Sequence, residues 1–549
     1  MAESAVKITK GRNTLKWLLL FTPSIFIAAV VVYPFIQLLY SNANFDFASQ
    51  ITGSSPVAQL TRKAIQNSIV QGAVSALLSF VAGLPVGLFL GRHTFRLKRM
   101  VNSIVIIPFF LPSILVVFAF ISGFGSNSSM AHILPFTESA SSGFTGIIAV
   151  NTFFNAPLVA LFTMTAVEQS DVALNEAAMT LGAADVRRFR TVWGKDALLA
   201  ASGAALLAFT YSFAGFAAPL IIGGPGYFTL DAWIYFMVKT LNNLQAAMVL
   251  ALIEALILVL PALSYIIFSS RQRRVTGSQL RLPVQDQRKN GYFYAGAAYT
   301  FFWVVVELYL LSSVFAASLE NSSGQWWHFA NYIQLFGGRT TSAIGISAAS
   351  SILNTVFYGT MTSLLVVTLG LMWITGRRRL NYKNRFASEP LQYVPLIISS
   401  IIMAFSVSVV FGIITPESLI WVLIILAQTS VAIPVVLRVI DSGFSSISHT
   451  YTEAALTLRG NPFFEVEMPM ARSTFASALM FAFAISLGEF SATNFLATTN
   501  YVPLTVEMYL LRGVRLFGAS FAAASLLLII SIVSFYFIQR LGERFIGFR

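Results

Sequence analysis

The chain is dominated by apolar stretches, each long enough to cross a lipid bilayer. A membrane-spanning helix needs about 20 mostly apolar residues, and a helix satisfies its own backbone hydrogen bonds in lipid. Only 10% of the 549 residues are charged and 56% are hydrophobic, whereas soluble proteins are about 25% charged. The sequence therefore predicts an all-α membrane protein with about 12 transmembrane helices. The expected spans cover residues 17–41, 66–91, 101–123, 145–168, 197–222, 243–269, 294–318, 351–375, 391–414, 417–439, 473–497 and 517–539.

The positions of the basic residues predict how these spans are oriented. With the N-terminus in the cytoplasm, 29 of the 35 Lys and Arg residues fall in cytoplasmic segments and 6 fall outside. Cytoplasmic loops are normally the basic ones, so we expect a multi-pass protein of the cell membrane with both termini in the cytoplasm. The net charge of +13 follows from this topology, and no nucleic-acid partner is expected. The first span is too long for a cleaved signal peptide and is expected to be retained.

Several kinds of catalytic and metal chemistry are excluded by missing residues or spacings. The absence of cysteine excludes disulfides, thiolate metal sites and cysteine nucleophiles. The four histidines form no metal-ligand spacing, and no G-x-x-x-x-G-K-[ST] sequence is present, since Gly194-Lys195 is followed by Asp196. We therefore expect no metal site, no catalytic residue, no enzyme activity and no cofactor bound by this chain.

The two halves of the chain carry matching residues in the same order. Asn67 and Gly83 match Asn354 and Gly370 at an offset of 287 residues. The offset changes only in two loops, around 124–144 and 183–195, which indicates an internal duplication. Six spans in each half give both halves the same orientation, so the pathway of a transporter would lie between two parallel repeats. Other matching pairs are Pro157 with Pro434 at 277, and Phe209 with Phe483 and Tyr235 with Tyr509 at 274.

The duplication divides the chain into three expected parts. The first six-helix module covers 1–269, a basic and polar cytoplasmic linker covers 270–293, and the second module covers 294–549. The linker contains Gly and Pro, as connecting segments commonly do.

A repeated cytoplasmic motif lies between the fourth and fifth spans of each half. It reads EAAMTLGAADVRRFRTVWGKD over 176–196 and EAALTLRGNPFFEVEMP over 453–469. An acidic residue followed by alanines favours a helix N-terminus, and the glycines permit a sharp turn into a second short helix. Two copies at matched places indicate a docking surface for a partner rather than an ordinary connector. The residues assigned to this surface are Glu176, Ala177, Ala178 and Gly182, and Glu453, Ala454, Ala455 and Gly460.

These paired loops resemble those of type I ABC importer permeases, in which the loop docks on the ATPase subunit. The segment 483–497 (FAISLGEFSATNFLA) is similar to the fifth helix of that family, and the likeness extends over nearly the whole chain. Fusion of two modules resembles the thiamine and ferric-iron permeases. The resemblance implies two ABC ATPase subunits that hold ATP and Mg²⁺, an external substrate-binding protein, and a membrane lipid environment.

The sequence departs from the family pattern in ways that put symmetrical coupling in doubt. The first loop ends with Gly194-Lys195 where the family usually has Leu-Pro, while the second keeps Met468-Pro469. The second loop also carries Arg459 where Gly is expected, with Gly460 one place later.

Three glutamates inside the expected spans are candidates for a transport pathway, because ionisable residues are costly in lipid. Glu489, beside Gly488, is assigned equally to a pathway or gate and to a structural hydrogen bond. For Glu254 and Glu307 the structural role is favoured. Carboxylates along a cavity would suit a cationic substrate.

The expected function is that of the permease subunit of an ATP-driven importer, which moves a small solute such as thiamine or ferric ion by alternating access. The alternative is an ion-coupled secondary transporter that relays protons through the intramembrane glutamates. A membrane scaffold without transport is less favoured because Pro and Gly interrupt the spans.

Overall fold

The computed structural model is helical throughout the residues that it describes, and no strand occurs among them. These residues are 21–40, 53–275, 291–320, 328–378 and 394–546, apart from 127, 129, 131–132, 134, 169, 171, 396, 413 and 446. The chain forms two compact units, each described by itself below. We call Phe45–His328 the N-unit, and Met1–Asn44 with Phe329–Arg549 the C-unit.

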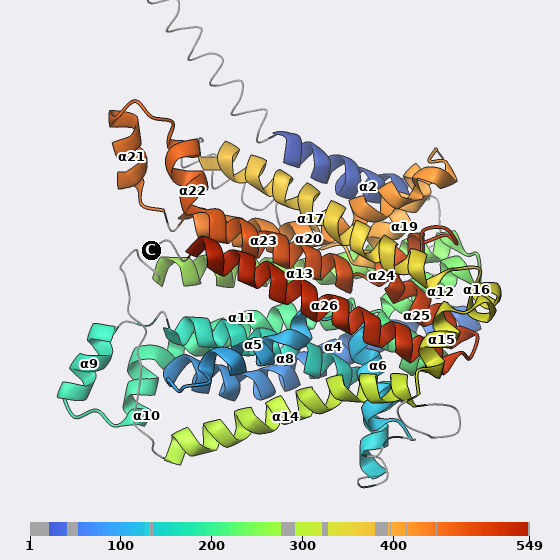
Figure 1. Cartoon of the computed structure of the whole chain (residues 1–549), viewed down its shortest axis with the longest axis horizontal. Coiled ribbons are helices and arrows are strands. Elements are labelled where there is room, and N and C mark those ends of the chain that lie inside the picture. Colours follow the sequence, from blue (N-terminus) through green and yellow to red (C-terminus); the bar gives the residue numbers. More distant parts are fainter. Residues whose placement is uncertain are drawn as a thin grey trace, which may run out of the picture. The chain divides into compact units, whose positions relative to one another are not determined.

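The N-unit is built around three long helices that pack side by side, α4, α8 and α11 (Figure 1). α5 packs on α8, α13 packs on α11 and α12, and α14 packs on α4, α5 and α6. The helices are α4 (Pro56–Arg92), α5 (Lys98–Phe110), α6 (Ser113–Phe124), α8 (Gly143–Glu168), α9 (Val172–Thr180), α10 (Asp185–Arg188), α11 (Gly194–Phe213), α12 (Leu230–Lys239), α13 (Leu244–Val275) and α14 (Gly291–Leu319), with shorter helical turns η2 (Pro135–Ser141), η3 (Phe189–Trp193), η4 (Pro219–Gly223) and η5 (Pro225–Tyr227).

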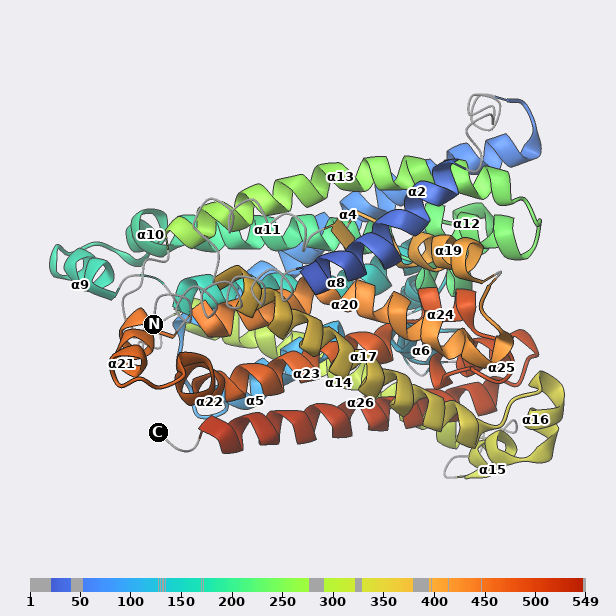
Figure 2. The same ribbon diagram turned by 90° about the horizontal axis from the view of Figure 1, so that it is seen from above.

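The C-unit repeats this arrangement with α17, α20 and α23 at its centre and α26 packed on α23. Figure 2 gives a second view of the same elements. The helices are α2 (Tyr33–Tyr40), α15 (Ala330–Phe336), α16 (Gly338–Ile344), α17 (Ala348–Arg378), α19 (Ser400–Phe411), α20 (Ile420–Ser445), α21 (His449–Thr457), α22 (Met468–Met470), α23 (Arg472–Gly488), α24 (Ser491–Leu496), α25 (Leu504–Gly513) and α26 (Phe517–Ile546), with the turns η1 (Ala28–Val32), η7 (Glu417–Leu419) and η8 (Phe463–Glu467).

The expected spans all have helical counterparts in the described residues. Nine helices are long and apolar enough to cross a membrane, and two bent helix pairs would raise the number to 11. The bent pairs are α5 with α6, at 104°, and the segment Phe463–Met470 with α23, at 56°. The remaining expected span, 391–414, contains the shorter apolar helix α19. Proline explains part of this bending, because Pro108 lies inside α5 and Pro469 inside α22.

The internal duplication is visible in the helix boundaries. α6 and α19 match at an offset of 287 at both ends, α8 and α20 at 277, and α12 and α25 at 274. Ser68 and Thr355, which follow the matched residues Asn67 and Asn354 at the same offset of 287, have the same role in each half. The Ser68 hydroxyl accepts the N–H of Leu230 at 2.7 Å, and the Thr355 hydroxyl accepts the N–H of Leu504 at 2.8 Å. Each of these bonds fixes the start of the helix that follows the fifth span.

The compact units do not coincide with the sequence modules expected at 1–269 and 294–549, because the first helix of each half belongs to the other half's unit. α2 packs on α19, whereas α14 packs on α4, α5 and α6. Polar contacts hold α14 in place: Ser313 bonds to Ser122 at 2.7 Å, and the Tyr309 hydroxyl donates to the Gly123 carbonyl at 2.6 Å. Residues 276–290 of the expected linker lie outside the described residues.

Close contact between α4 and α8 depends on a glycine at every fourth residue of α4. A Cβ on Gly87 would lie 2.5 Å from the Ala160 carbonyl oxygen, and one on Gly91 would lie 2.8 Å from the Val167 Cβ. Small residues at this spacing let two helix backbones approach closely in a membrane protein. Gly83 starts the stripe and would overlap the Ala156 carbonyl in the same way.

We predict that Gly87→Ala lowers the stability of the protein by about 1–3 kcal/mol, because the added methyl group forces α4 away from α8. The measurement is the thermal unfolding midpoint in detergent. Gly226→Ala is the control, since a Cβ there would meet nothing within 4 Å. Equal midpoints for the two variants would contradict close α4–α8 packing.

Candidate functional site

Each half presents a short helix outside its spans at the Glu-Ala-Ala motif. α9 contains Glu176 and α21 contains Glu453, and both glutamates are exposed. In both views each helix lies beyond the ends of the long helices of its own unit (Figures 1 and 2). The Thr180 hydroxyl donates to the Glu176 carbonyl at 3.0 Å, and Thr457 makes the same bond to Glu453 at 2.9 Å. The two motif helices therefore have the same local structure.

Exposed apolar side chains occupy matched positions on the two motif helices. Leu181 and Leu458, each just after its helix, are 86% and 83% exposed. An apolar surface that faces neither lipid nor a protein core is typical of a protein-contact site. Two more matched exposed pairs extend this surface, Leu174 with Tyr451 and Met179 with Leu456.

The turn after each motif helix has the same backbone hydrogen bonds but not the same residue. The N–H of Ala183 bonds to the Ala178 carbonyl at 2.9 Å, and the N–H of Gly460 bonds to Ala455 at 2.8 Å. The left-handed position is filled by Gly182 with φ +72° in the first half and by Arg459 with φ +56° in the second. Gly460, the glycine expected at this turn, lies one residue after the left-handed position, which Arg459 itself adopts. Such a conformation costs a non-glycine residue about 1 kcal/mol or more.

The return segments that follow these turns differ between the halves. Both contain a five-residue π-helical turn, η3 and η8, at an offset of 274. At the matched last position, η3 has Trp193 and η8 has Glu467. The Arg92 guanidinium lies over the Trp193 ring at 4.9 Å, whereas Arg378 pairs with the Glu467 carboxylate at 3.4 Å. The return segment is thus held by a cation–π contact at η3 in the first half and by an ion pair at η8 in the second half.

A break in the fifth span is the second shared feature. α11 ends at Phe213, two residues before Gly215, and α23 ends at Gly488, directly before Glu489. Each break leaves backbone groups that a continuous helix would have satisfied, and buried polar side chains gather at both places.

In the N-unit, the break is held by an amide–hydroxyl cluster from three helices. The Gln71 side-chain amide donates to the Ser212 carbonyl, and Asn151 donates to the Gln71 side-chain oxygen at 2.8 Å. Asn155 donates to the Ser212 hydroxyl at 3.1 Å. All four residues are buried or nearly so, which makes these bonds costly to lose.

The C-unit has a corresponding amide–hydroxyl cluster centred on Gln428, the counterpart of Asn151. Ser486 and Thr362 donate to its side-chain oxygen at 2.6 and 3.0 Å, and its amide donates to the Thr493 hydroxyl at 3.0 Å. Ser486 corresponds to Ser212 at an offset of 274. Both halves therefore join the second, fourth and fifth spans through buried amides.

Glu489 lies in the break itself and bridges two elements. Its carboxylate accepts the N–H of Ala492 at 2.8 Å, which caps α24, and the Ser400 hydroxyl at 3.1 Å, which ties it to α19. The side chain is only 8% exposed. Glu489 thus makes the structural hydrogen bonds that one of its two expected roles requires. The bond to Ser400 connects the break to α19.

Glu254 and Glu307 lie on separate helices of the N-unit, α13 and α14, and both are fully buried. Within the described part of the chain, neither carboxylate oxygen of Glu307 accepts a hydrogen bond. No three Asp, Glu or His side chains come together as a metal group among the described residues.

Sequence reasoning missed a fourth buried glutamate, Glu507 on α25. It lies outside the long apolar helices, so it was not considered as an intramembrane charge. It occupies the position of Trp233 in the first half, whose indole N–H donates to Thr61 at 3.0 Å. Comparison of the two repeats would have revealed it, because a charge replaces a buried aromatic residue there.

The family of binding-protein-dependent transport system inner membrane components matches the chain twice, over residues 83–274 and 367–547. The chain belongs to this family. The two matches fall in the two halves that the offsets define, which confirms the duplication and the all-α permease fold.

Relatives of this permease include proteins of similar, fused length. The ferric transport system permease protein FbpB of Actinobacillus pleuropneumoniae is 24% identical over 91% of this chain and 74% of its own length. The thiamine transport system permease protein ThiP of Escherichia coli K12 is 23% identical over 87% of this chain and 89% of its own. The molybdate/tungstate transport system permease protein WtpB of Pyrococcus furiosus is 26% identical, over 40% of this chain and 80% of its own length.

Burial raises the pKa of Glu507 from 4.5 to about 7, an effect that the nearby Ser351 hydroxyl opposes. Because the folded protein holds this proton more tightly than the unfolded chain, the contribution to stability is fully present below pH 4.5 and is lost as the pH rises to about 7. We predict that the free energy of unfolding falls by up to about 3 kcal/mol across this window.

Glu507→Gln should remove this part of the pH dependence, because the amide does not titrate. Thermal unfolding at several pH values measures it, with the exposed Glu417→Gln as control. A slope that persists in Glu507→Gln would show that another group is responsible.

Proposed function

We propose that this chain supplies both halves of the membrane-spanning part of an ATP-driven importer, with one coupling loop in each half. The observation that carries this proposal is the pair of matched motif helices, each exposed, acidic at the motif and apolar beside it. Such a surface in two copies fits two partner subunits of the same kind. Membership of a binding-protein-dependent family supports the same assignment.

The proposed partners are two ABC ATPase subunits at α9 and α21 and a substrate-binding protein on the opposite side of the membrane. ATP and Mg²⁺ are bound by the ATPases, since the chain has no P-loop sequence. The chain itself acts as a non-enzymatic subunit with no cofactor of its own. Both termini lie in the cytoplasm, on the side where the Lys and Arg residues gather.

In this mechanism, ATP-driven closure of the ATPases moves the two motif helices. Each return segment transmits the movement to the fifth span, where Gly488 and Glu489 lie at the break in the second half. The bond between Glu489 and Ser400 would then change when the pathway alternates between its two open states. Glu489 is our proposed gate residue, and Glu254 and Glu307 are secondary candidates for the pathway.

The proposed substrate is a small cationic solute, either ferric ion or thiamine. The names of the two fused relatives support these choices, and buried carboxylates in the membrane suit a cation. An ion-coupled transporter remains the alternative, favoured by the buried Glu307 carboxylate. The two motif helices would have no role in that alternative.

We predict that the double variant Glu176→Lys, Glu453→Lys loses retention of the ATPase, because reversing both charges places cations in the two docking surfaces. Co-purification from membranes that contain the ATPase measures the effect. Each single variant should retain an intermediate amount. Glu417→Lys makes the same charge change at an exposed site outside the motif loops and should retain the ATPase fully.

Unchanged ATPase retention in the double variant would remove the coupling-loop assignment.

The transport function is tested by uptake into proteoliposomes that contain the chain and its co-purified ATPase. We expect uptake of ferric ion or thiamine to require ATP and the loaded binding protein, and ATP hydrolysis to rise with it. Dissipation of the proton gradient should leave the initial rate unchanged. Uptake that follows the proton gradient without ATP would instead favour the ion-coupled alternative.

A further inference from the structure

A cavity of about 380 Å³ lies beside the first coupling loop, within the N-unit. Three helical segments line it: the end of α4, the return segment of the motif loop, and the start of α14. Its volume lies in the range of small-ligand cavities, roughly 300–1,000 Å³. The lining residues are Pro85, Leu88, Phe89, Arg92, His93, Val186, Phe189, Trp193, Tyr292 and Gly296.

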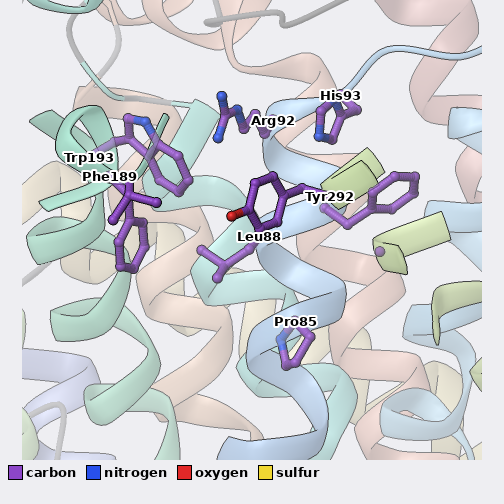
Figure 3. A pocket seen from close by; sticks show the side chains of 10 residues that line it. Pro85, Leu88, Arg92, His93, Phe189, Trp193 and Tyr292 are labelled. Carbon is purple, nitrogen blue, oxygen red and sulfur yellow. The ribbon is translucent and has the colours of Figure 1, made fainter. Parts of the chain in front are cut away.

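The cavity is a trough with one polar end. Figure 3 shows the nitrogen-bearing groups of Arg92, His93 and Trp193 at one end and Pro85 at the other, with Leu88 between them. Pro85, Leu88 and Arg92 lie on one face of α4, and at 1.5 Å per residue the wall from Pro85 to Arg92 is about 10 Å long. The trough therefore extends about two helical turns from the basic end of a membrane span.

The polar end of the trough is basic. Arg92 is the cationic group, and none of the ten lining residues is Asp or Glu. His93 is buried between the rings of Phe89 and Phe293, at centroid distances of 5.4 and 5.2 Å. A ligand here would meet a positive charge at one end and aliphatic or aromatic walls along the rest.

We propose that this trough binds an anionic phospholipid of the cytoplasmic leaflet, with its phosphate at Arg92 and an acyl chain along Leu88 and Pro85. Basic pockets between helices at the cytoplasmic side of a membrane are suited to anionic lipid headgroups. The end of α4 lies on the side that we assign to the cytoplasm from its charge. The apolar walls match an acyl chain rather than a soluble anion.

Among the described residues of the second half, the corresponding return segment carries an acid, so we assign this site to the first coupling loop. At the position of Trp193 it has Glu467, whose carboxylate pairs with Arg378 at 3.4 Å. An anionic headgroup there would meet a negative charge. Lipid in the first half would contact α4, α14 and the return segment together, and so stabilise the position of one loop but not the other.

The test is native mass spectrometry of the full chain in detergent, titrated with dioleoyl phosphatidylglycerol or dioleoyl phosphatidylcholine. We expect tighter binding of phosphatidylglycerol. Arg92→Gln should weaken phosphatidylglycerol binding about fivefold, the value for one cationic side chain at an anionic surface. It should weaken phosphatidylcholine binding less, because the choline cation of that lipid already balances its phosphate. Leu88→Trp should weaken both lipids because the indole fills the trough.

Arg96→Gln is the matched control, since it removes the same charge four residues later, from an exposed residue that does not line the trough. It should keep the preference for phosphatidylglycerol. An equal loss in Arg96→Gln, or equal binding of both lipids to the unaltered chain, would overturn the proposal. Displacement of the lipid by millimolar inorganic phosphate would also overturn it, in favour of a soluble anion.

If Leu88→Trp does not fold, the difference in phosphatidylglycerol binding between Arg92→Gln and Arg96→Gln still tests the proposal.

Discussion

The break in the fifth span is the constraint on which the rest of the structure depends. A helix interrupted within a membrane leaves backbone groups that must find partners, because unsatisfied groups in an apolar medium cost several kcal/mol. In one half, the Gln71 amide donates to the Ser212 carbonyl, and Asn151 donates to the Gln71 side-chain oxygen. In the other half, the Glu489 carboxylate accepts the N–H of Ala492, and the Ser486 hydroxyl donates to Gln428. The bonds of Gln71 and Gln428 join the second, fourth and fifth spans at one level. The motif loop leads directly into the same fifth span, so the chain itself connects the exposed motif helix to the break.

Much of this architecture could be predicted from the sequence. Apolar length predicts the spans, and the offsets of 287, 277 and 274 residues reappear as matched helix boundaries. These signals are local or periodic, and a single chain contains all the information that they need. The exchange of the first helices could not be predicted, because apolar length does not specify which core a span packs against. That choice depends on particular contacts, such as Ser313 with Ser122, between residues 191 positions apart.

The site was predicted less completely than the fold. The exposed motif helices follow from composition, but the turn residue does not, since glycine preference pointed to Gly460 and the backbone instead places Arg459 in the left-handed region. The burial of Glu507 could not be predicted from hydropathy either, because Glu507 lies on a short helix between two spans. These residues are distinguished by features of the folded chain, namely the backbone angle of Arg459 and the complete burial of Glu507.

The two halves share a framework but differ in the contacts that hold their motif loops. In the second half, Gly460 has no room for a side chain because the Glu465 carboxylate occupies that space, and Glu465 accepts the N–H of Asn461 at 3.0 Å. This cap offsets part of the cost of the left-handed Arg459, and the ion pair of Glu467 holds the return segment from the other side. The first half has a relaxed glycine turn and a return segment held by an aromatic contact beside an apolar trough. A loop fastened by charged groups within the protein is independent of the surrounding lipid, whereas a loop that borders an open trough depends on what fills it. The duplication thus preserves the connection of each motif loop to the fifth span, while the contacts that hold the two loops differ.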